Sequence, residues 1–183
     1  MLNNKELLYK THGIILGHED ANDADAVLAI YTQKRGKILV RARGVRKKES
    51  KLRGFCQLFA FNNFLLAKSR GLADVLAGAE EKENWRVLKN DLARLAVAFY
   101  ISEVLSKLVS APEKDQELWN FLVKVFQTLN NKKYAPAKIK IAFERRLLEI
   151  LGYGGDYKSP INKIQALTGE AVKSDKFLQE CLQ

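Results

Sequence analysis

The stretch ADAVLAIYTQKRGKILVRARG, residues 24–44, decides the fold because two strand patterns flank a short turn. In residues 24–32, branched and aromatic side chains alternate with other apolar ones, which is typical of a β-strand. Gln33–Gly36 supplies polar residues and a glycine for the turn. Residues 37–44 then alternate apolar and basic side chains, so the stretch predicts a hairpin with one face in a core. The alternate residues expected on that core face are Ile38, Val40 and Ala42.

The opposite face of the second strand is basic. Lys37, Arg41 and Arg43 alternate with the apolar residues, so they should point away from the core, together with Leu39. Residues 45–54 continue the charge in a loop with a glycine at each boundary, which we expect to be a mobile cationic arm. The strand face and the arm are therefore predicted to form one continuous basic stripe.

Charge is concentrated in the window from Lys34 to Arg53. Ten of these twenty residues are Lys or Arg and only Glu49 is acidic, so the window carries +9 of the chain's formal charge of +10. Such a concentration favours a binding surface for a polyanion over a device for solubility. The candidate binding residues are Lys34, Arg35, Lys37, Arg41, Arg43, Arg46, Lys47, Lys48, Lys51 and Arg53.

A nucleic acid is the favoured polyanion, because Lys and Arg displace the counterions that condense on phosphates. A solvated charged face, or contact with an acidic protein, remains the alternative. Several aromatic residues near the window could stack on bases, but their alternation with other apolar residues favours positions in the core. These aromatic residues are Tyr9, Tyr31, Phe55, Phe59 and Phe61.

Three further strand patterns surround the hairpin, at residues 9–18, 57–67 and 72–80. Five short strands over about 80 residues predict a small barrel, and an OB-fold is the leading candidate. A five-stranded SH3-like barrel is the competing architecture, since the number of strands fits both.

The pattern becomes helical after residue 80, so the predicted fold class is α+β: an OB-fold domain over residues 1–80 and a helical domain over residues 81–183. Pro136 suits the first turn of the third helix and Gly152 the position after its end. The tail beyond it looks weakly structured. The predicted helices are Trp85–Ser110, Asp115–Leu129, Pro136–Leu151 and two short ones at residues 161–167 and 175–182.

Several classes of protein are disfavoured by composition. Cys56 and Cys181 are the two cysteines and form no CxxC pair, so no zinc ribbon or redox motif is encoded, and a reducing cytoplasm fits best. Residues 1–6 do not lead into an apolar signal-peptide region. No apolar run approaches the roughly 18 residues of a membrane span.

No catalytic or metal site stands out, and we expect neither an enzyme nor a cofactor. His12 and His18 fall on one strand, with Cα atoms about 20 Å apart, so they cannot share a metal. The acidic run from Glu19 to Asp25 lacks the glycine and the final Glu of an EF-hand loop, and we expect a solvated turn that faces the basic strand. The motifs of P-loop proteins, serine hydrolases and zinc proteases are missing from the sequence.

A series of short motifs resembles the N-terminal OB domain of the bacterial DNA repair protein RecO family. The helical part is similar too, so the resemblance covers roughly residues 9–155. It departs at the C-terminus, where many family members carry a cysteine-rich zinc-binding insertion and this chain has only Cys181. The matching pieces are Gly13–Leu16, Asp23–Asp25, Gly36-Lys37, Ala42–Arg46, Ser50–Gly54, Gly71-Leu72, Ala98–Tyr100, Leu118-Trp119 and Arg146–Tyr153.

The resemblance implies a recombination mediator. Such proteins bind single- and double-stranded DNA, anneal complementary strands, displace or remodel single-strand-binding protein, and work with RecR to load RecA. The acidic, hydrophobic C-terminal tail of single-strand-binding protein docks on their helical domain. Motif matching carries over only Arg43, Arg46 and Arg53, and the other basic residues rest on the charge argument.

Two other functions stay open: an RNA-binding OB module of the translation machinery, and an adaptor whose basic stripe binds an acidic protein tail. For annealing, we hypothesise that the strand face follows one DNA backbone while the arm at residues 45–54 contacts another.

Overall fold

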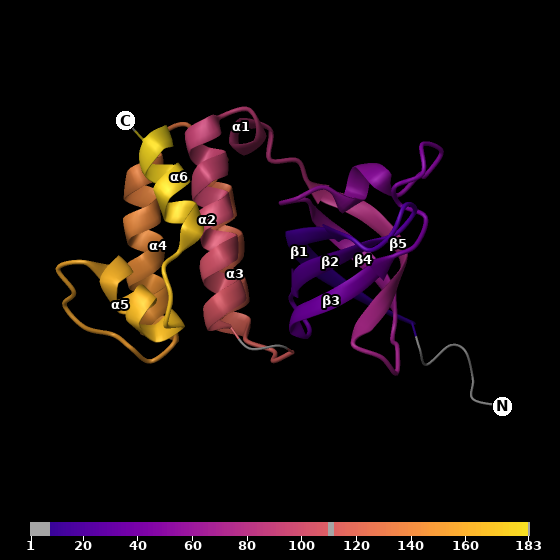
Figure 1. Cartoon of the computed structure of the whole chain (residues 1–183), viewed down its shortest axis with the longest axis horizontal. Helices are drawn as coiled ribbons and strands as arrows, with labels where there is room; N and C mark the ends of the chain where they lie inside the picture. The colour runs from indigo at the N-terminus through magenta and orange to yellow at the C-terminus, as the bar shows by residue number, and fades with distance from the viewer. Residues whose placement is uncertain (1–7, 110–111, 183) are drawn as a thin grey trace. The chain divides into compact units, whose positions relative to one another are not determined.

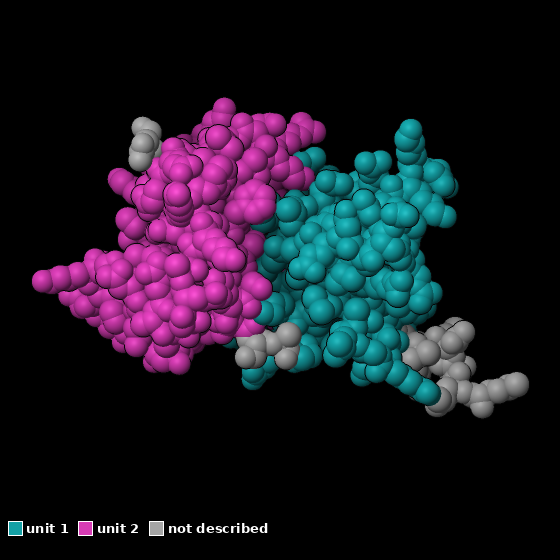
Figure 2. Space-filling view, in the orientation of Figure 1, with its two compact units in different colours: residues 1–84, 111–115 teal, residues 85–110, 116–183 magenta. Residues whose placement is uncertain are grey.

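The computed structural model describes residues 8–109 and 112–182, which form two compact units (Figures 1 and 2). The first unit holds the strands up to Asn84 together with the short segment 112–115. The second unit holds the helices that follow Trp85. The predicted α+β class is therefore confirmed. No helix in the described ranges has the length and apolar character that a membrane crossing requires.

The first unit is a closed five-stranded barrel with the order β1-β2-β3-β5-β4. Neighbouring strands are antiparallel except β3 and β5, which run parallel, while β1 closes the barrel by pairing with both β2 and β4. This Greek-key arrangement confirms the OB-fold over the SH3-like alternative. The strands are β1 (Leu8–Asp20), β2 (Ala26–Thr32), β3 (Gly36–Ala42), β4 (Phe61–Ala67) and β5 (Ala73–Glu83).

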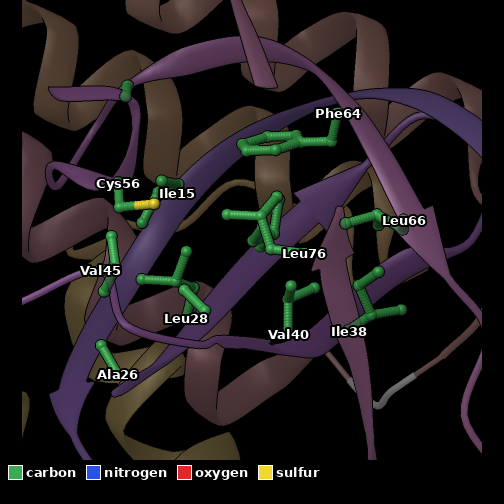
Figure 3. Close-up of a cluster of buried hydrophobic side chains, with 13 residues drawn as sticks. Ile15, Ala26, Leu28, Ile38, Val40, Val45, Cys56, Phe64, Leu66 and Leu76 are labelled. Carbon is green, nitrogen blue, oxygen red and sulfur yellow. The ribbon is translucent and has the colours of Figure 1, made fainter. Parts of the chain in front are cut away.

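The predicted hairpin of β2 and β3 forms, with Ile30 opposite Ile38. Ile38, Val40 and Ala42 are buried, whereas Leu39 and Arg41 between them are exposed. The buried side chains converge on one core that every strand of the barrel supplies (Figure 3). Period-two alternation thus places the basic residues of β3 outside the barrel.

The fourth strand begins later than predicted, at Phe61 rather than at residue 57. Arg53–Cys56 forms a short 3-10 helix, η1, and Phe59 has a positive φ of 63°. The Phe59 N–H donates to the Ile15 carbonyl at 2.8 Å, so the chain reverses there before it joins the sheet. The apolar pattern runs through this turn without a break, which explains the wrong boundary.

Six helices make up the described part of the second unit. The first predicted helix divides, because Asp91 caps a new helix by accepting a hydrogen bond from the Arg94 N–H at 3.1 Å. Its predicted end, Ser110, lies outside the described residues. The two short helices predicted in the tail are confirmed as α5 and α6. The prediction of weak structure there is wrong, since α6 packs on α2 and Leu178 is buried. The helices are α1 (Arg86–Lys89), α2 (Leu92–Leu108), α3 (Gln116–Leu129), α4 (Pro136–Ile150), α5 (Pro160–Thr168) and α6 (Lys173–Cys181).

Candidate nucleic-acid interface

Most of the predicted binding residues lie on the surface of the barrel. Arg35 and Lys37 are half-buried, and burial lowers the pKa of Lys37. The other eight are exposed: Lys34, Arg41, Arg43, Arg46, Lys47, Lys48, Lys51 and Arg53.

Three of the ten basic residues are held by carboxylates from elsewhere in the barrel. Arg35 forms an ion pair with the buried Asp74. Arg41 donates to Asp25 at 2.8 Å. Arg46 lies 2.9 Å from Asp20. Each of these guanidinium groups already has an anionic partner, so it offers a phosphate less charge than its formal +1 suggests.

Asp25 fixes the point where β3 passes into the basic loop. Its carboxylate accepts hydrogen bonds from the Gly44 N–H at 2.8 Å and from Arg41 at 2.8 and 3.1 Å. The Gly44 hydrogen bond, and then those of Arg41, lower the pKa of Asp25 below its ordinary value. The acidic turn therefore faces the basic strand, as the sequence predicts.

The segment at residues 45–54, predicted as a mobile arm, folds against the barrel as a series of turns that lead into η1. Val45 and Cys56 point into the same core as Ile15 (Figure 3). The Arg46 N–H also donates to the Ala24 carbonyl at 3.0 Å. Val45 and Cys56 thus anchor the two ends of the loop in the core and give it a defined conformation. The charge pattern alone did not predict this order.

Apart from the half-buried Lys37, the remaining six basic residues form no ion pair in the part of the chain that the structure describes. We call these six the unpaired cations. All six are exposed, and five of them follow β3 on the ordered loop and η1. They are Lys34, Arg43, Lys47, Lys48, Lys51 and Arg53.

The aromatic residues near the window belong mainly to the fold. Tyr31, Phe59 and Phe61 are buried, as their alternation predicts, so they present no ring for a base to stack on. The Tyr9 hydroxyl donates to Asp74 at 2.5 Å and accepts from Arg35 at 2.9 Å. Desolvation, followed by the Asp74 hydrogen bond, raises the pKa of Tyr9 to about 12.

The charge count missed a second basic element, the loop of residues 68–72 between β4 and β5. Lys68 and Arg70 in this loop are exposed. The parallel pairing of Leu39 with Ala73 brings the end of the loop beside the basic strand. The Lys-Ser-Arg-Gly sequence before a predicted strand is a weak signal for such a loop, and only the strand order shows which neighbour it meets.

The helical unit carries a separate hollow of about 590 Å³ between α3 and α4. Its floor is apolar and includes Phe121 and Phe143, whose rings stack with centroids 5.8 Å apart. Cationic side chains line it too, and among them Arg146 forms ion pairs with Glu117 and Glu149. These lining cations are Lys124, Lys133, Lys138 and Arg146.

Comparison with known families matches both units. A family model described as "Recombination protein O N terminal" matches residues 6–80. A second, described as "Recombination protein O C terminal", matches residues 89–181. The chain belongs to the RecO family. The two RecO matches correspond to the barrel and to the helical unit, so the resemblance seen in the short motifs extends over nearly the whole chain.

Curated relatives carry the name "DNA repair protein RecO". The protein of Alkaliphilus metalliredigens is 32% identical over 146 residues, which cover 80% of this chain and 59% of the relative. That of Desulforamulus reducens is 37% identical over 115 residues, 63% of this chain and 44% of the relative. The Roseiflexus protein is 28% identical over 181 residues, 93% of this chain and 63% of the relative. The chain thus spans less than two thirds of the length of these relatives.

Proposed function

We propose that this member of the RecO family is a DNA-binding recombination mediator that binds single- and double-stranded DNA and anneals complementary strands. The observation that carries the proposal is the set of six unpaired cations on an ordered surface of the OB-fold. Phosphates can replace water and counterions around these groups without first breaking an ion pair within the protein. The family membership makes DNA the favoured polyanion.

Annealing follows from the same electrostatics. Two complementary strands repel each other through their phosphates, and a cationic surface that binds both reduces this repulsion. The loop after β3 is anchored in the core by Val45 and by Cys56, so its cations keep their spacing when a strand binds. We propose that the unpaired cations Lys34 and Arg43, which flank β3, contact one strand and those of the loop contact the other.

The proposed role needs no covalent chemistry, and we propose that the protein acts without catalysing a bond change. It would work on chromosomal DNA in the cytoplasm, at the nucleoid. The partners implied by the family are RecR, single-strand-binding protein and, through them, RecA. Loading of RecA onto coated single strands requires that the mediator also contacts the coating protein.

The hollow between α3 and α4 fits the acidic, hydrophobic tail of single-strand-binding protein. The half-buried Phe121 and the exposed Tyr134 and Ala142 offer an apolar surface for the hydrophobic residues of the tail. Lys124 and Lys138 line the same hollow and are exposed, so they can attract its carboxylates. We propose this hollow as the docking place of the tail.

An annealing assay tests the proposed function. Two complementary oligonucleotides, one with a donor dye and one with an acceptor, are mixed with the protein, and the approach to the duplex is followed by energy transfer. The variant K47E/K48E/K51E reverses three exposed cations that have no ion pair in the described structure. It should fold normally and lose most of the acceleration. Annealing at the wild-type rate by this folded variant would refute the proposal.

Competition separates DNA binding from its rivals. A reader of the RNA 2′-hydroxyl would bind an RNA strand more tightly than the matched DNA strand, which would favour the translation alternative. An adaptor for acidic proteins would bind an acidic peptide and show no measurable affinity for DNA at low salt. We expect tight binding of DNA with no preference for RNA.

Docking of the tail is tested with a peptide that ends in acidic and then hydrophobic residues and a free carboxylate. Its affinity, measured by fluorescence anisotropy, should fall in the variant K124E/K138E. The exposed pair Lys173 and Lys176, on α6 and outside the residues that line the hollow, provides the control K173E/K176E with the same change in net charge. Equal loss in both variants would contradict a local docking site.

A further inference from the structure

A hollow on the barrel unit, about 400 Å³ in volume, differs from the rest of the basic surface because two exposed leucines line it. Leu72, at the end of the loop between β4 and β5, is 97% exposed, and Leu39 on β3 is 44% exposed. Single apolar residues on a surface need no explanation. Here, however, two of them share one hollow with the cationic Lys37 and with Arg35, whose ion-pair partner Asp74 also lines it.

The strand register explains why the Leu39 side chain is exposed to solvent. Its neighbour on β2 is Ala29, and its neighbour on β5 is Ala73. Both are alanines, so no larger side chain covers the leucine from either side. Ala29, Leu39 and Ala73 form a row of apolar residues across β2, β3 and β5. Leu39 has the largest side chain of the three, so a planar apolar group could pack against it.

The loop that carries Leu72 has a defined conformation. The buried carboxylate of Asp74 accepts a hydrogen bond from the Ser69 N–H at 2.9 Å and from the Tyr9 hydroxyl at 2.5 Å. The Gly71 N–H donates to the Ser69 hydroxyl at 3.0 Å. Leu72 is therefore presented to solvent by hydrogen bonds that hold the loop, and its exposure is not explained by a loose chain.

The cationic side chains near the hollow indicate what kind of ligand it binds. Lys68 and Arg70 are exposed on the loop, and neither forms an ion pair in the described ranges. Lys37 and Arg41 flank Leu39 on β3. An apolar pair with exposed cations on the same loop and strand matches a ligand with planar apolar groups along an anionic chain. Single-stranded DNA has this chemistry, whereas duplex DNA keeps its base faces stacked inside.

From this arrangement we infer that Leu39 and Leu72 contact the unstacked bases of single-stranded DNA and so favour the binding of single strands relative to duplex. The inference rests on the proposed DNA binding. The surrounding cations bind the phosphates of either form. The two leucines add affinity only where a base face is available.

The test compares three ligands of equal length: an oligothymidylate, a blunt duplex, and a single strand in which abasic sites replace the central nucleotides. The variants are L72S and L39T, both at exposed positions where a polar residue is tolerated. Partial loss of apolar contact corresponds to about fivefold weaker binding of oligothymidylate for each variant. Binding of the duplex and of the abasic strand should stay within about twofold of wild type, since neither offers a base face at this position.

Two controls complete the experiment. L92S changes another exposed leucine, the first residue of α2 in the helical unit, and should bind all three ligands as wild type does. L72F places a larger planar side chain at the same position and should bind oligothymidylate at least as tightly as wild type. Unchanged binding of oligothymidylate by both L72S and L39T would overturn the inference. So would an equal loss for all three ligands. Wild-type protein that binds no DNA at low salt would instead refute the proposed function itself.

Discussion

The unpaired cations should determine how steeply DNA binding depends on salt. Each phosphate that a cation neutralises adds about 0.7 to the slope of log K against log salt for a single strand, and about 0.9 for duplex. If each of the six contacts one phosphate, the slopes are about −4.2 and about −5.4. The triple variant K47Q/K48Q/K51Q removes half of these contacts and should reduce the slopes to about −2.1 and about −2.7.

The same arithmetic gives the loss of affinity. Electrostatic binding vanishes near 1 M salt, so at about 0.1 M the triple variant should bind a single strand about 100-fold more weakly than wild type, and duplex about 500-fold more weakly. Fluorescence anisotropy of a labelled oligothymidylate, titrated at several concentrations between about 50 and 300 mM salt, measures both quantities.

The matched control removes three exposed lysines of the helical unit instead: K158Q/K173Q/K176Q. It lowers the net charge equally and should leave the slope within about half a unit of wild type. Equal reductions in the two variants would show that net charge, rather than the loop after β3, governs binding. A slope unchanged by K47Q/K48Q/K51Q would refute the assignment of phosphate contacts to these residues.

Three further predictions concern stability and reactivity. Gly36 has a φ of +63°, and an added Cβ would lie 1.9 Å from a backbone oxygen of Glu113. The variant G36A should therefore lower the free energy of unfolding, measured by urea titration, by more than about 1 kcal/mol. The control G54A, whose added Cβ would have open space around it, should change this free energy little. Burial opposes ionisation of Glu103, but hydrogen bonds from Ser174, Lys173 and Lys107 lower its pKa to about 2. The stability that its carboxylate supplies is present above its ordinary pKa of 4.5 and is lost as the pH falls towards 2; E103Q should flatten this part of the pH profile of stability. Burial raises the pKa of Cys56 to about 12, so this thiol should resist a thiol reagent in the folded protein and react on unfolding, while the half-exposed second cysteine should react in the folded protein.

Local patterns predicted the barrel well where side-chain alternation decides it. The hairpin of β2 and β3, its buried residues and its outward basic face all follow from the period of two. The predicted start of β4 was wrong because the positive φ at Phe59, where the chain turns, does not change the hydrophobic pattern. The break at Asp91 was missed for a related reason, since apolar residues continue on both sides of this cap.

The candidate site was less predictable, because its electrostatic partners are distant in the sequence. Arg41 meets a carboxylate 16 residues earlier, and Arg35 meets one 39 residues later. The loop at residues 68–72 joins the site only through the parallel pairing of β3 with β5. A count of charges within a window contains none of this information, since it depends on how the barrel closes.

The ion pairs divide the basic window into two roles. Arg35, Arg41 and Arg46 bind Asp74, Asp25 and Asp20, so they hold together the turn, the strand end and the loop that display the remaining cations. Formal charge therefore overstates the number of phosphate contacts, while the geometry of those contacts is better defined than a flexible arm would allow. Cations of this kind bind the phosphates of both forms, and their electrostatic contribution is larger for duplex. A preference for single strands must then come from a group that contacts bases, and on this surface the exposed Leu39 and Leu72 are placed to do so.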